Sequence, residues 1–394
     1  MLDVPIPANI RIKELLKLIS DDELAVLSRD SGVDHQVKSL FGRSMFYLIL
    51  YGLATCERTS LRGLEDIFNS NRFKVLFSLD ATSTTRYNSL SDRLATMELS
   101  FFEKAYQMVY SEFSQKFSQR EAEAHHVVRV DSTMVAETAN KLAQGMRVGS
   151  RTAGRQVKYT VCMDDLFPSS VEVFTSQSEL SEDRTIPRTI LKYTDPGPST
   201  VFVFDRGVSS RQAFADIDAR KWSFVTRMKA GARYNLLQDL PLGLQEDRAG
   251  NLEITSDQLI QLYDAKGKAM ENRFRLVKAL DDRQKEFFFL SNLLEVPPAM
   301  IIALYKKRWD IEVFFRFIKQ ELNFGHFMST NINGIKIILY MTLILSMLIH
   351  IYKKSNAVGY KTAKRRVAME LEDLVTIQIV IACGGNPDIV FRGP

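Results

Sequence analysis

The chain has 394 residues, a length that allows one large core with a smaller domain, or two or three modest domains. Hydrophobic residues make up 45% and charged residues 25%, which is average for globular proteins and excludes a disordered or fibrous chain. The net charge of +5 permits a polyanionic partner but excludes the charge density of a histone-like protein. Cys56, Cys162 and Cys383 lie far apart without paired spacing, so a reducing cytoplasm fits better than a disulfide framework or a zinc site.

Residues 1–123 are predicted to be helical. Apolar residues recur every three to four positions in Ile10–Leu18, Asp22–Leu27, Gln36–Leu53, Leu61–Asn69, Tyr87–Ala95 and Ser100–Phe117. Ser20 and Ser60 are expected to cap two of these helices, because a serine hydroxyl can accept a hydrogen bond from a first-turn N–H. Such a bundle suits a DNA-recognition domain. A bundle used only for packing or dimerisation fits the same pattern.

Beyond residue 123 the pattern changes to strands that alternate with helices. Strands are expected at Val127–Val130, Tyr159–Met163, Ser170–Phe174, Val201–Phe204 and Ser223–Met228, and helices at Glu179–Tyr193 and Ser209–Arg220. This order predicts an α/β fold in which a mixed sheet is flanked by helices.

Residues 231–292 are predicted to form a β-rich insertion, with short strands separated by Gly, Asp and Asn. Pro297-Pro298 then starts one long helix that runs to Leu322, since proline is tolerated only in a first helical turn. Ile337–Tyr352 is almost wholly apolar but shorter than the roughly 20 residues that span a bilayer. We therefore expect a buried helix here, within a helical carboxyl-terminal segment, residues 335–394, and no membrane partner.

Two carboxylates directly follow apolar strands, in Val-Val-Arg-Val-Asp131 and Val-Phe-Val-Phe-Asp205-Arg-Gly207. Side chains at the carboxyl ends of central strands lie at the rim of a sheet, where open α/β folds place their ligand sites. Gly207 is expected to permit a sharp exit from the strand, so that Asp205 faces outward. Either aspartate alone could be an ordinary turn residue.

The long helix supplies a third acid. Tyr305, Arg308, Glu312 and Lys319 are separated by three, four and seven residues, which places them on one stripe at about 3.6 residues per turn. Arg308 and Glu312 could be a plain surface pair. Most neighbouring residues on this helix are apolar, so we expect its polar residues to line a site at a core edge.

Phosphodiester chemistry uses such a grouping of acids. Two divalent ions about 3.5–4 Å apart can activate the attacking oxygen and stabilise the leaving one, and carboxylates hold Mg²⁺ well. Arg308 and Lys319 would then be available to grip DNA phosphates.

The sequence resembles DDE transposases of the insertion-sequence-four family, with an RNase H-like core. The resemblance rests on Asp131-Ser-Thr, on Phe204-Asp205-Arg-Gly, and on a Y-x2-R-x3-E-x6-K signature from Tyr305 to Lys319. It implies that Asp131, Asp205 and Glu312 are catalytic and bind two Mg²⁺ ions, with Mn²⁺ as a substitute. It also implies that Tyr305, Arg308 and Lys319 contact DNA.

The same resemblance implies a function and partners. The expected activity is cut-and-paste transposition: binding of the terminal inverted repeats, metal-dependent cleavage, and joining of the 3′ ends to target DNA. A homodimer on paired ends of double-stranded DNA is expected, in the bacterial cytoplasm and at the nucleoid when bound to DNA. The expected domains are a recognition domain at 1–123, a catalytic core at 124–334, and the helical segment at 335–394.

A second group of cations lies in a Gly- and Ser-containing stretch that reads as a loop. Arg147, Arg151, Arg155 and Lys158 are spaced so that they could follow a phosphate backbone, and the stretch begins close to Asp131. A solvated loop without DNA contacts is the plain alternative.

Two other functions fit the same residues. One is a nuclease of this fold that cleaves without transposing. The other is a transposase-derived DNA-binding regulator without catalysis, which the presence of all three acids disfavours.

Overall fold

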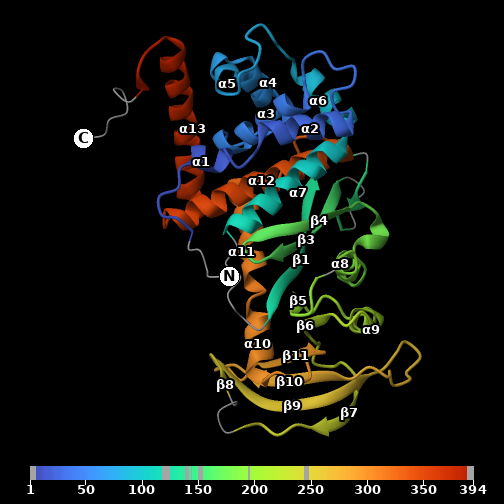
Figure 1. Cartoon of the computed structure of the whole chain (residues 1–394). Helices are drawn as coiled ribbons and strands as arrows, with labels where there is room; N and C mark the ends of the chain where they lie inside the picture. Colours follow the sequence, from blue (N-terminus) through green and yellow to red (C-terminus); the bar gives the residue numbers. More distant parts are fainter. Residues whose placement is uncertain are drawn as a thin grey trace. The chain divides into compact units, whose positions relative to one another are not determined.

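The computed structural model describes residues 6–117, 125–137, 142, 144–149, 154–193, 196–243 and 248–387. The chain forms two compact units (Figure 1). The helical unit comprises Met1–Gln119, Val135–Arg155 and Arg316–Pro394, and the sheet unit comprises Arg120–Met134 and Gln156–Phe315. The boundaries of these units differ from those of the three predicted segments, because the carboxyl-terminal helices pack with the amino-terminal helices in one unit.

The helical unit contains the six helices predicted for the first 117 residues, together with the short helix α5, which was not predicted. They are α1 (Ile12–Leu16), α2 (Asp21–Ser31), α3 (Gly42–Thr55), α4 (Leu61–Asn69), α5 (Asn71–Leu76), α6 (Tyr87–Thr96) and α7 (Leu99–Phe117). Both predicted caps are confirmed: Ser20 accepts from the Glu23 N–H, and Ser60 accepts from the Gly63 N–H. The unit also holds the two-residue strand β2 (Met146–Arg147) and the carboxyl-terminal helices α12 (Ile332–Ser355) and α13 (Tyr360–Ala382).

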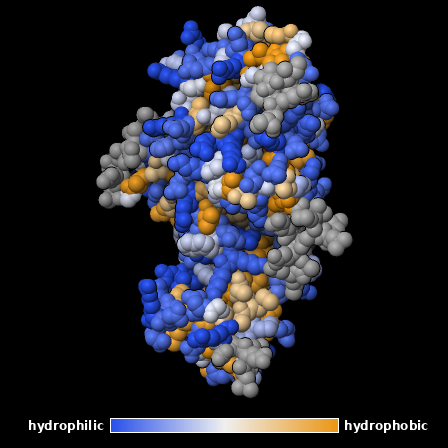
Figure 2. Space-filling view, turned by 90° about the vertical axis from the view of Figure 1, so that its left-hand side faces the viewer, coloured by the Kyte–Doolittle hydropathy of each residue, from blue (hydrophilic) through white to orange (hydrophobic). Residues whose placement is uncertain are grey.

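Helix α12 is the buried apolar helix expected from the sequence. It is long and apolar enough to cross a membrane, but 78% of its most apolar window is buried inside the protein. It packs against α3, α6, α7 and α13, as Figure 1 shows for α7 and α13. On the face drawn in Figure 2, hydrophobic residues form separate groups among hydrophilic ones. Burial of α12 therefore confirms the prediction of a core helix.

The sheet unit is built on one mixed sheet. Its strands are ordered β3-β1-β5-β6-β11-β10-β9-β7, with β4 beside β3 and β8 beside β9. The bounds are β1 (His126–Glu137), β3 (Arg155–Asp164), β4 (Phe167–Phe174), β5 (Thr200–Phe204), β6 (Ser223–Arg227), β7 (Tyr234–Asp239), β8 (Arg248–Ala249), β9 (Leu252–Leu262), β10 (Phe274–Leu280) and β11 (Glu286–Ser291). Strands β1, β5 and β6 are parallel, whereas β11 joins β6 antiparallel.

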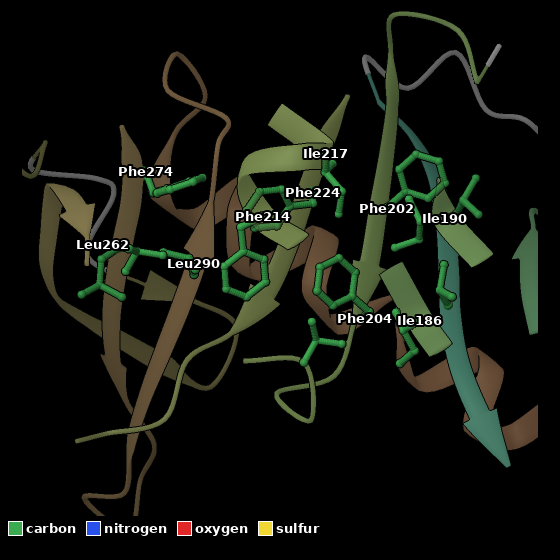
Figure 3. Packing of buried hydrophobic residues seen from close by; sticks show 14 of the residues in the cluster. Ile186, Ile190, Phe202, Phe204, Phe214, Ile217, Phe224, Leu262, Phe274 and Leu290 are labelled. Atoms are coloured by element: carbon green, nitrogen blue, oxygen red, sulfur yellow. The ribbon is translucent and has the colours of Figure 1, made fainter. Parts of the chain in front are cut away.

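Helices cover both faces of this sheet. One face packs against α8 (Glu182–Ile190), which follows the short helix η1 (Gln177–Glu179), and against α9 (Arg211–Ala219). Figure 3 shows Ile186, Ile190, Phe214 and Ile217 from these helices against Phe202, Phe204 and Phe224 of the sheet. The opposite face packs against α10 (Pro298–Lys306) through Val127, Val201, Val203, Val225, Ile301, Ile302 and Leu304. The predicted mixed sheet flanked by helices is confirmed.

The predicted β insertion does not form a separate layer. Its last strand, β11, pairs with β6, so β7, β9, β10 and β11 extend the central sheet. Leu262, Phe274 and Leu290 belong to the same core as Phe224, as Figure 3 shows. The alternation of short strands was predicted, but their attachment to β6 is a long-range pairing that periodicity does not reveal.

The predicted long helix is interrupted. Helix α10 ends at Lys306, and α11 (Trp309–Glu321) starts three residues later, continuing from the sheet unit into the helical unit. Between them, the N–H groups of Arg308 and Asp310 donate three residues back, to Tyr305 and Lys307. This tighter turn replaces the regular helical ladder, so a continuous helix from Pro298 to Leu322 was a wrong prediction.

A buried ion pair fixes the start of α10, and its removal should destabilise the sheet unit. Arg275 binds Asp257 through both carboxylate oxygens and also donates to the carbonyls of Leu294 and Val296. Both side chains are nearly inaccessible, at 7% and 1% exposure. Asp257→Ala leaves a buried guanidinium without its anion and should lower the free energy of unfolding by about 3–5 kcal/mol.

The measurement is urea unfolding followed by tryptophan fluorescence, since both tryptophans, Trp222 and Trp309, lie in the sheet unit. The control is Lys192→Ala, which breaks a pair with Glu172 in which the lysine is 58% exposed. That change should cost less than about 1 kcal/mol. Equal losses in the two variants would contradict the assigned importance of the buried pair.

Candidate active site

The two predicted aspartates are placed side by side by strand register. Strands β1 and β5 are parallel, and their register ends with Val130 opposite Phe204. The next residues are Asp131 and Asp205. Neighbouring strands lie about 4.8 Å apart, and side chains alternate between the two faces. Both aspartates therefore lie on the face that packs against α10, the face of Val203.

Two local expectations need correction. Strand β1 does not end at Asp131 but continues to Glu137, because only its partner β5 ends there; β3 still flanks β1 on its other side. Gly207 does not take a left-handed conformation. A Cβ at Gly207 would come 1.5 Å from Oε2 of Glu182, so the glycine is needed for a close approach.

Arg308 joins the acids of the site. Its guanidinium lies 3.5 Å from Oδ2 of Asp131 and also donates to Oε1 of Glu312. The Tyr305 hydroxyl donates to Oδ1 of Asp205 at 3.2 Å, and the Tyr305 ring lies under the guanidinium at 5.6 Å. The structure thus brings Asp131, Asp205, Tyr305, Arg308 and Glu312 together, although the intervening helix is broken.

The environment of the site shifts the pKa values of Asp131 and Arg308. Burial raises the pKa of the Asp131 carboxyl to about 7; the Ser132 N–H and Arg308 oppose this shift, whereas Glu182 and Asp205 add to it. Burial alone would lower the pKa of Arg308, but the surrounding phenol and carboxylates raise it. Arg308 is therefore always charged, yet it does not fully compensate the burial of Asp131 beside other acids.

Arg129 holds the turn from which Arg308 and Glu312 project. It lies on β1, two residues before Asp131, and it donates at 3.0 Å to the carbonyls of Lys307 and Asp165. It also pairs with Asp310 at 3.0 Å. Since Lys307 lies in the break between α10 and α11, Arg129 ties this break directly to the strand that carries Asp131.

Sequence reasoning missed Glu182 at this site. Its carboxylate packs over Gly207, two residues after Asp205, and burial together with Asp205 and Asp183 raises its pKa against the effect of Lys158 and Arg308. The adjacent Asp183 accepts from the N–H groups of Ser209 and Ser210. The sequence signal was the Ser-Glu-Asp start of α8, which reads as an ordinary capped helix.

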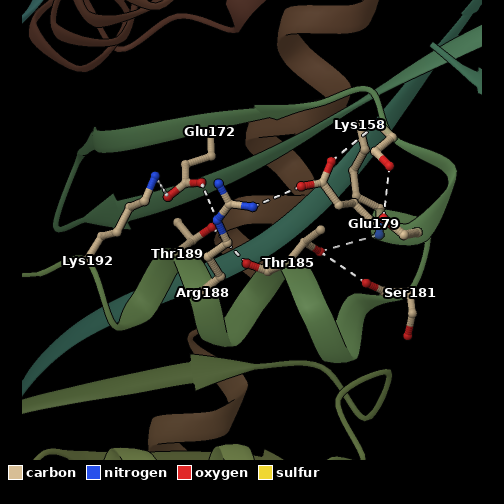
Figure 4. A network of polar contacts seen from close by, with 10 residues as sticks. Lys158, Glu172, Glu179, Ser181, Thr185, Arg188, Thr189 and Lys192 are labelled. Atoms are coloured by element: carbon tan, nitrogen blue, oxygen red, sulfur yellow. Dashed lines mark hydrogen bonds and ion pairs between the residues drawn. The ribbon is translucent and has the colours of Figure 1, made fainter.

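Lys158 does not belong to a flexible loop. It lies in β3, is 1% exposed, and donates to the Leu180 carbonyl and to Thr185 at the start of α8 (Figure 4). Figure 4 also shows the neighbouring ion pairs of Glu172 with Arg188 and Lys192. The expectation that Lys158 grips DNA is therefore wrong, because its amine is buried and already bound.

The other predicted DNA contacts lie in the helical unit. Arg147 is exposed on β2, and Arg155 begins β3 and donates to the Gly145 carbonyl at 3.3 Å. Arg151 lies outside the described residues. Lys319 is on the last turn of α11, where burial lowers the pKa of its amine. DNA contacts by these residues stay predictions.

The donor chemistry of the site fits a hard divalent cation. Asp131, Asp205 and Glu312 offer carboxylate oxygens, and burial, with a smaller effect of Glu182 and Asp205, raises the pKa of Asp131, so a bound cation would stabilise its ionised form. Within the described ranges, no three His, Cys, Asp or Glu side chains are grouped closely enough to hold a metal ion. Asp131 and Glu312 instead bind the Arg308 guanidinium, so a cation shared by the three acids would require a local rearrangement of Arg308.

Comparison with known proteins assigns the class. Residues 122–348 match the family model described as the transposase DDE domain, which is more than half of the chain. The chain belongs to this family of DDE transposases. The finer prediction of the insertion-sequence-four family stays a prediction.

Individual relatives agree with this class. The y4zB protein of Sinorhizobium fredii, which bears the name of a transposase, is 25% identical over 58% of this chain, and the chain spans 61% of that protein. A Geobacillus stearothermophilus protein named as the transposase of insertion sequence element IS5377 is 21% identical over 81% of this chain and 78% of its own length. The fold resembles that of piggyBac transposase, which was solved by cryo-EM in a synaptic complex with hairpin DNA. The superposition has a TM-score of 0.51 at 9% sequence identity, and it covers 94% of this chain and 82% of the piggyBac chain. This structural similarity supports the predicted RNase H-like fold.

The raised pKa of Asp131 should make stability pH-dependent. An unfolded aspartate ionises near 3.8, whereas the folded group holds its proton up to about 7. Folding therefore takes up a proton between these values, and the stabilisation is lost as the pH rises through 7. The free energy of unfolding of the metal-free protein should fall by up to about 4 kcal/mol between pH 4 and 8, relative to Asp131→Asn. Parallel pH profiles for the two proteins, measured by urea unfolding, would refute the assignment.

Loss of Arg129 should loosen the break between α10 and α11. Arg129→Met removes one hydrogen bond and one ion pair at the turn, those to Lys307 and Asp310, which should raise local opening at least tenfold. The readout is hydrogen–deuterium exchange of peptides that cover 305–312. Arg188→Met, which removes an arginine from α8, serves as the control and should leave these peptides unchanged. Unaltered exchange in Arg129→Met would show that the turn does not depend on this residue.

Proposed function

We propose that this chain is a metal-dependent transposase that cuts DNA at the ends of an insertion sequence and joins the freed 3′ ends to target DNA. The observation that carries the proposal is that Asp131 and Glu312 bind Arg308 while Asp205 binds the neighbouring Tyr305, within a chain of the DDE family. Arg308 and Tyr305 link the three acids, which come from two strands and a helix far apart in the sequence.

Asp131, Asp205 and Glu312 would hold the divalent cations, with Mg²⁺ as the natural ion and Mn²⁺ as a substitute. When bound, the cations supply Lewis-acid activation of the attacking oxygen and neutralise charge at the phosphate. The protein contributes rigid placement: adjacent parallel strands fix the aspartates, and the Arg129-bound turn fixes Glu312. Ionisation of Asp131 is required for this role, so binding should strengthen as the pH rises through 7.

Arg308 and Tyr305 would position the DNA. A guanidinium presents paired N–H donors that match phosphate oxygens, and its charge persists at any physiological pH. In the present arrangement Arg308 uses these donors on Asp131 and Glu312. Exchange of carboxylates for phosphate would couple cation binding to DNA binding, because cations neutralise the acids that now hold Arg308. Lys319, Arg147, Arg151 and Arg155 would add backbone contacts elsewhere on the DNA.

The proposed partners are the terminal inverted repeats and a target duplex, with two copies of the chain joining two ends in the bacterial cytoplasm. The membership in the DDE family and the likeness to a transposase solved with DNA support this choice. The helices of residues 6–117 would recognise the repeats.

The test is cleavage of DNA that carries the inverted repeats flanking the gene, with Mg²⁺ present. Wild-type protein should cut at the repeat ends and join the 3′ ends to a plasmid target. Asp205→Ala should reduce cutting at least a thousandfold while repeat binding changes less than threefold, because the carboxylate holds cations and not bases.

The matched control is Asp216→Ala, which removes an exposed carboxylate of α9 that accepts from Gln212. It should cut normally. Cleavage without joining would identify a nuclease, and binding without metal-dependent cleavage would identify a regulator. Normal cutting by Asp205→Ala would overturn the site assignment.

A further inference from the structure

Arg227 stands in the same row as the two aspartates. Strands β5 and β6 are parallel, with Val203 opposite Val225. Two residues further along, this register places Arg227 beside Asp205, as the β1–β5 register places Asp205 beside Asp131. The alternation of side chains puts all three on the face of α10. A cation thus follows two acids across three adjacent strands, at about 4.8 Å per strand.

The strand end that carries Arg227 is tied to Asp205. The hydroxyl of the preceding Thr226 donates to the carbonyls of Phe204 and Asp205, at 3.0 and 3.2 Å. Thr226 is fully buried, so this link is shielded from water. The residue before Arg227 is therefore hydrogen-bonded directly to the backbone of Asp205.

The Arg227 guanidinium lies over an aromatic face. Its centre is 4.8 Å from the ring centroid of Phe287 on β11. Its charge also reaches Tyr305, where it lowers the phenol pKa against the larger effect of burial. Tyr305 in turn packs edge-on against Phe289 at 5.4 Å and donates to Asp205. Arg227 is thus an electrostatic neighbour of the active site, held by stacking and not by an acid.

Arg227 has no anion of its own in the part of the chain that the structure describes. Its Nε is buried and has no hydrogen-bond partner among the described residues, and no carboxylate of those residues lies within 4.0 Å of its nitrogens. Arg308 and Arg129, by contrast, each pair with a carboxylate. A half-buried cation without an anion is costly, and stacking offsets only part of that cost.

We propose that Arg227 is a further substrate-binding residue, which grips a phosphate of the DNA strand that enters the active site. The inference rests on the proposed function. Stacking on Phe287 holds the flat face of the guanidinium and leaves its N–H edge for a phosphodiester, the ligand that this edge fits in two-point geometry. No base contact is involved, so binding through Arg227 is independent of sequence.

The experiment measures binding of the inverted-repeat DNA over a range of salt concentrations, in Ca²⁺ to prevent cutting. Arg227→Gln should weaken binding at least tenfold at low salt and reduce the slope of log K against log salt by about 1, as expected for one lost phosphate contact. Arg227→Lys should keep the slope, because the charge remains, but recover only part of the affinity.

The matched control is Arg220→Gln. Arg220 stacks on Trp222 at 4.9 Å in the same way, but it precedes the other end of β6. Its loss should leave affinity and slope unchanged.

A neutral methylphosphonate, moved one linkage at a time through the repeat end, locates the contact. One position should weaken wild-type binding about tenfold and have no further effect in Arg227→Gln; if Arg227→Gln does not fold, Arg227→Met, which also removes the charge, replaces it in this comparison. An unchanged slope in Arg227→Gln, or additive losses at every position, would overturn the inference. Failure of the wild-type protein to bind or cut the repeat would instead overturn the proposed function.

Discussion

The site depends on one constraint, the parallel register of β1, β5 and β6. Val130 faces Phe204 and Val203 faces Val225, so the residues that follow fall into one row on one face of the sheet. A shift of one residue in either pairing would turn a carboxylate toward the α8 and α9 face and bury it among phenylalanines. The aromatic core on that face makes such a shift costly. Hydrophobic packing on one face of the sheet thereby fixes the positions of the charged side chains on the other face.

The acids gathered in this way repel one another, and the positive charge of Arg308 compensates part of that repulsion. Its guanidinium joins Asp131 and Glu312, while Tyr305 holds Asp205. Burial, with a smaller effect of Glu182 and Asp205, raises the pKa of Asp131 despite Arg308, so one guanidinium does not offset the burial of this carboxylate. Under the proposed function, this excess negative charge beside Arg308 would make divalent ions and DNA bind more strongly together than either alone.

Local sequence predicted what local interactions determine. The apolar strands that precede Asp131 and Asp205, the serine caps, and the buried α12 follow from periodicity and capping alone. Long-range pairings were not predictable in this way. Arg129, far away on β1, binds the break after Lys306, and the residue between η1 and α8 that binds the Lys158 amine, Leu180, is likewise distant in the sequence. The sequence did not predict a role for Glu182 or Arg227, because each lies near the site only through contacts between segments that are distant in the sequence.

The central claim is that Asp131, Asp205 and Glu312 share a divalent cation, and iron-directed cleavage tests it most directly. Fe²⁺ replaces Mg²⁺, ascorbate and peroxide generate hydroxyl radicals at the bound ion, and mass spectrometry maps the broken peptide bonds. The account predicts cuts clustered around residues 131, 205 and 312, suppressed by excess Mg²⁺ and absent in Asp205→Asn. Cleavage elsewhere, or around only one of these positions, would contradict a shared site.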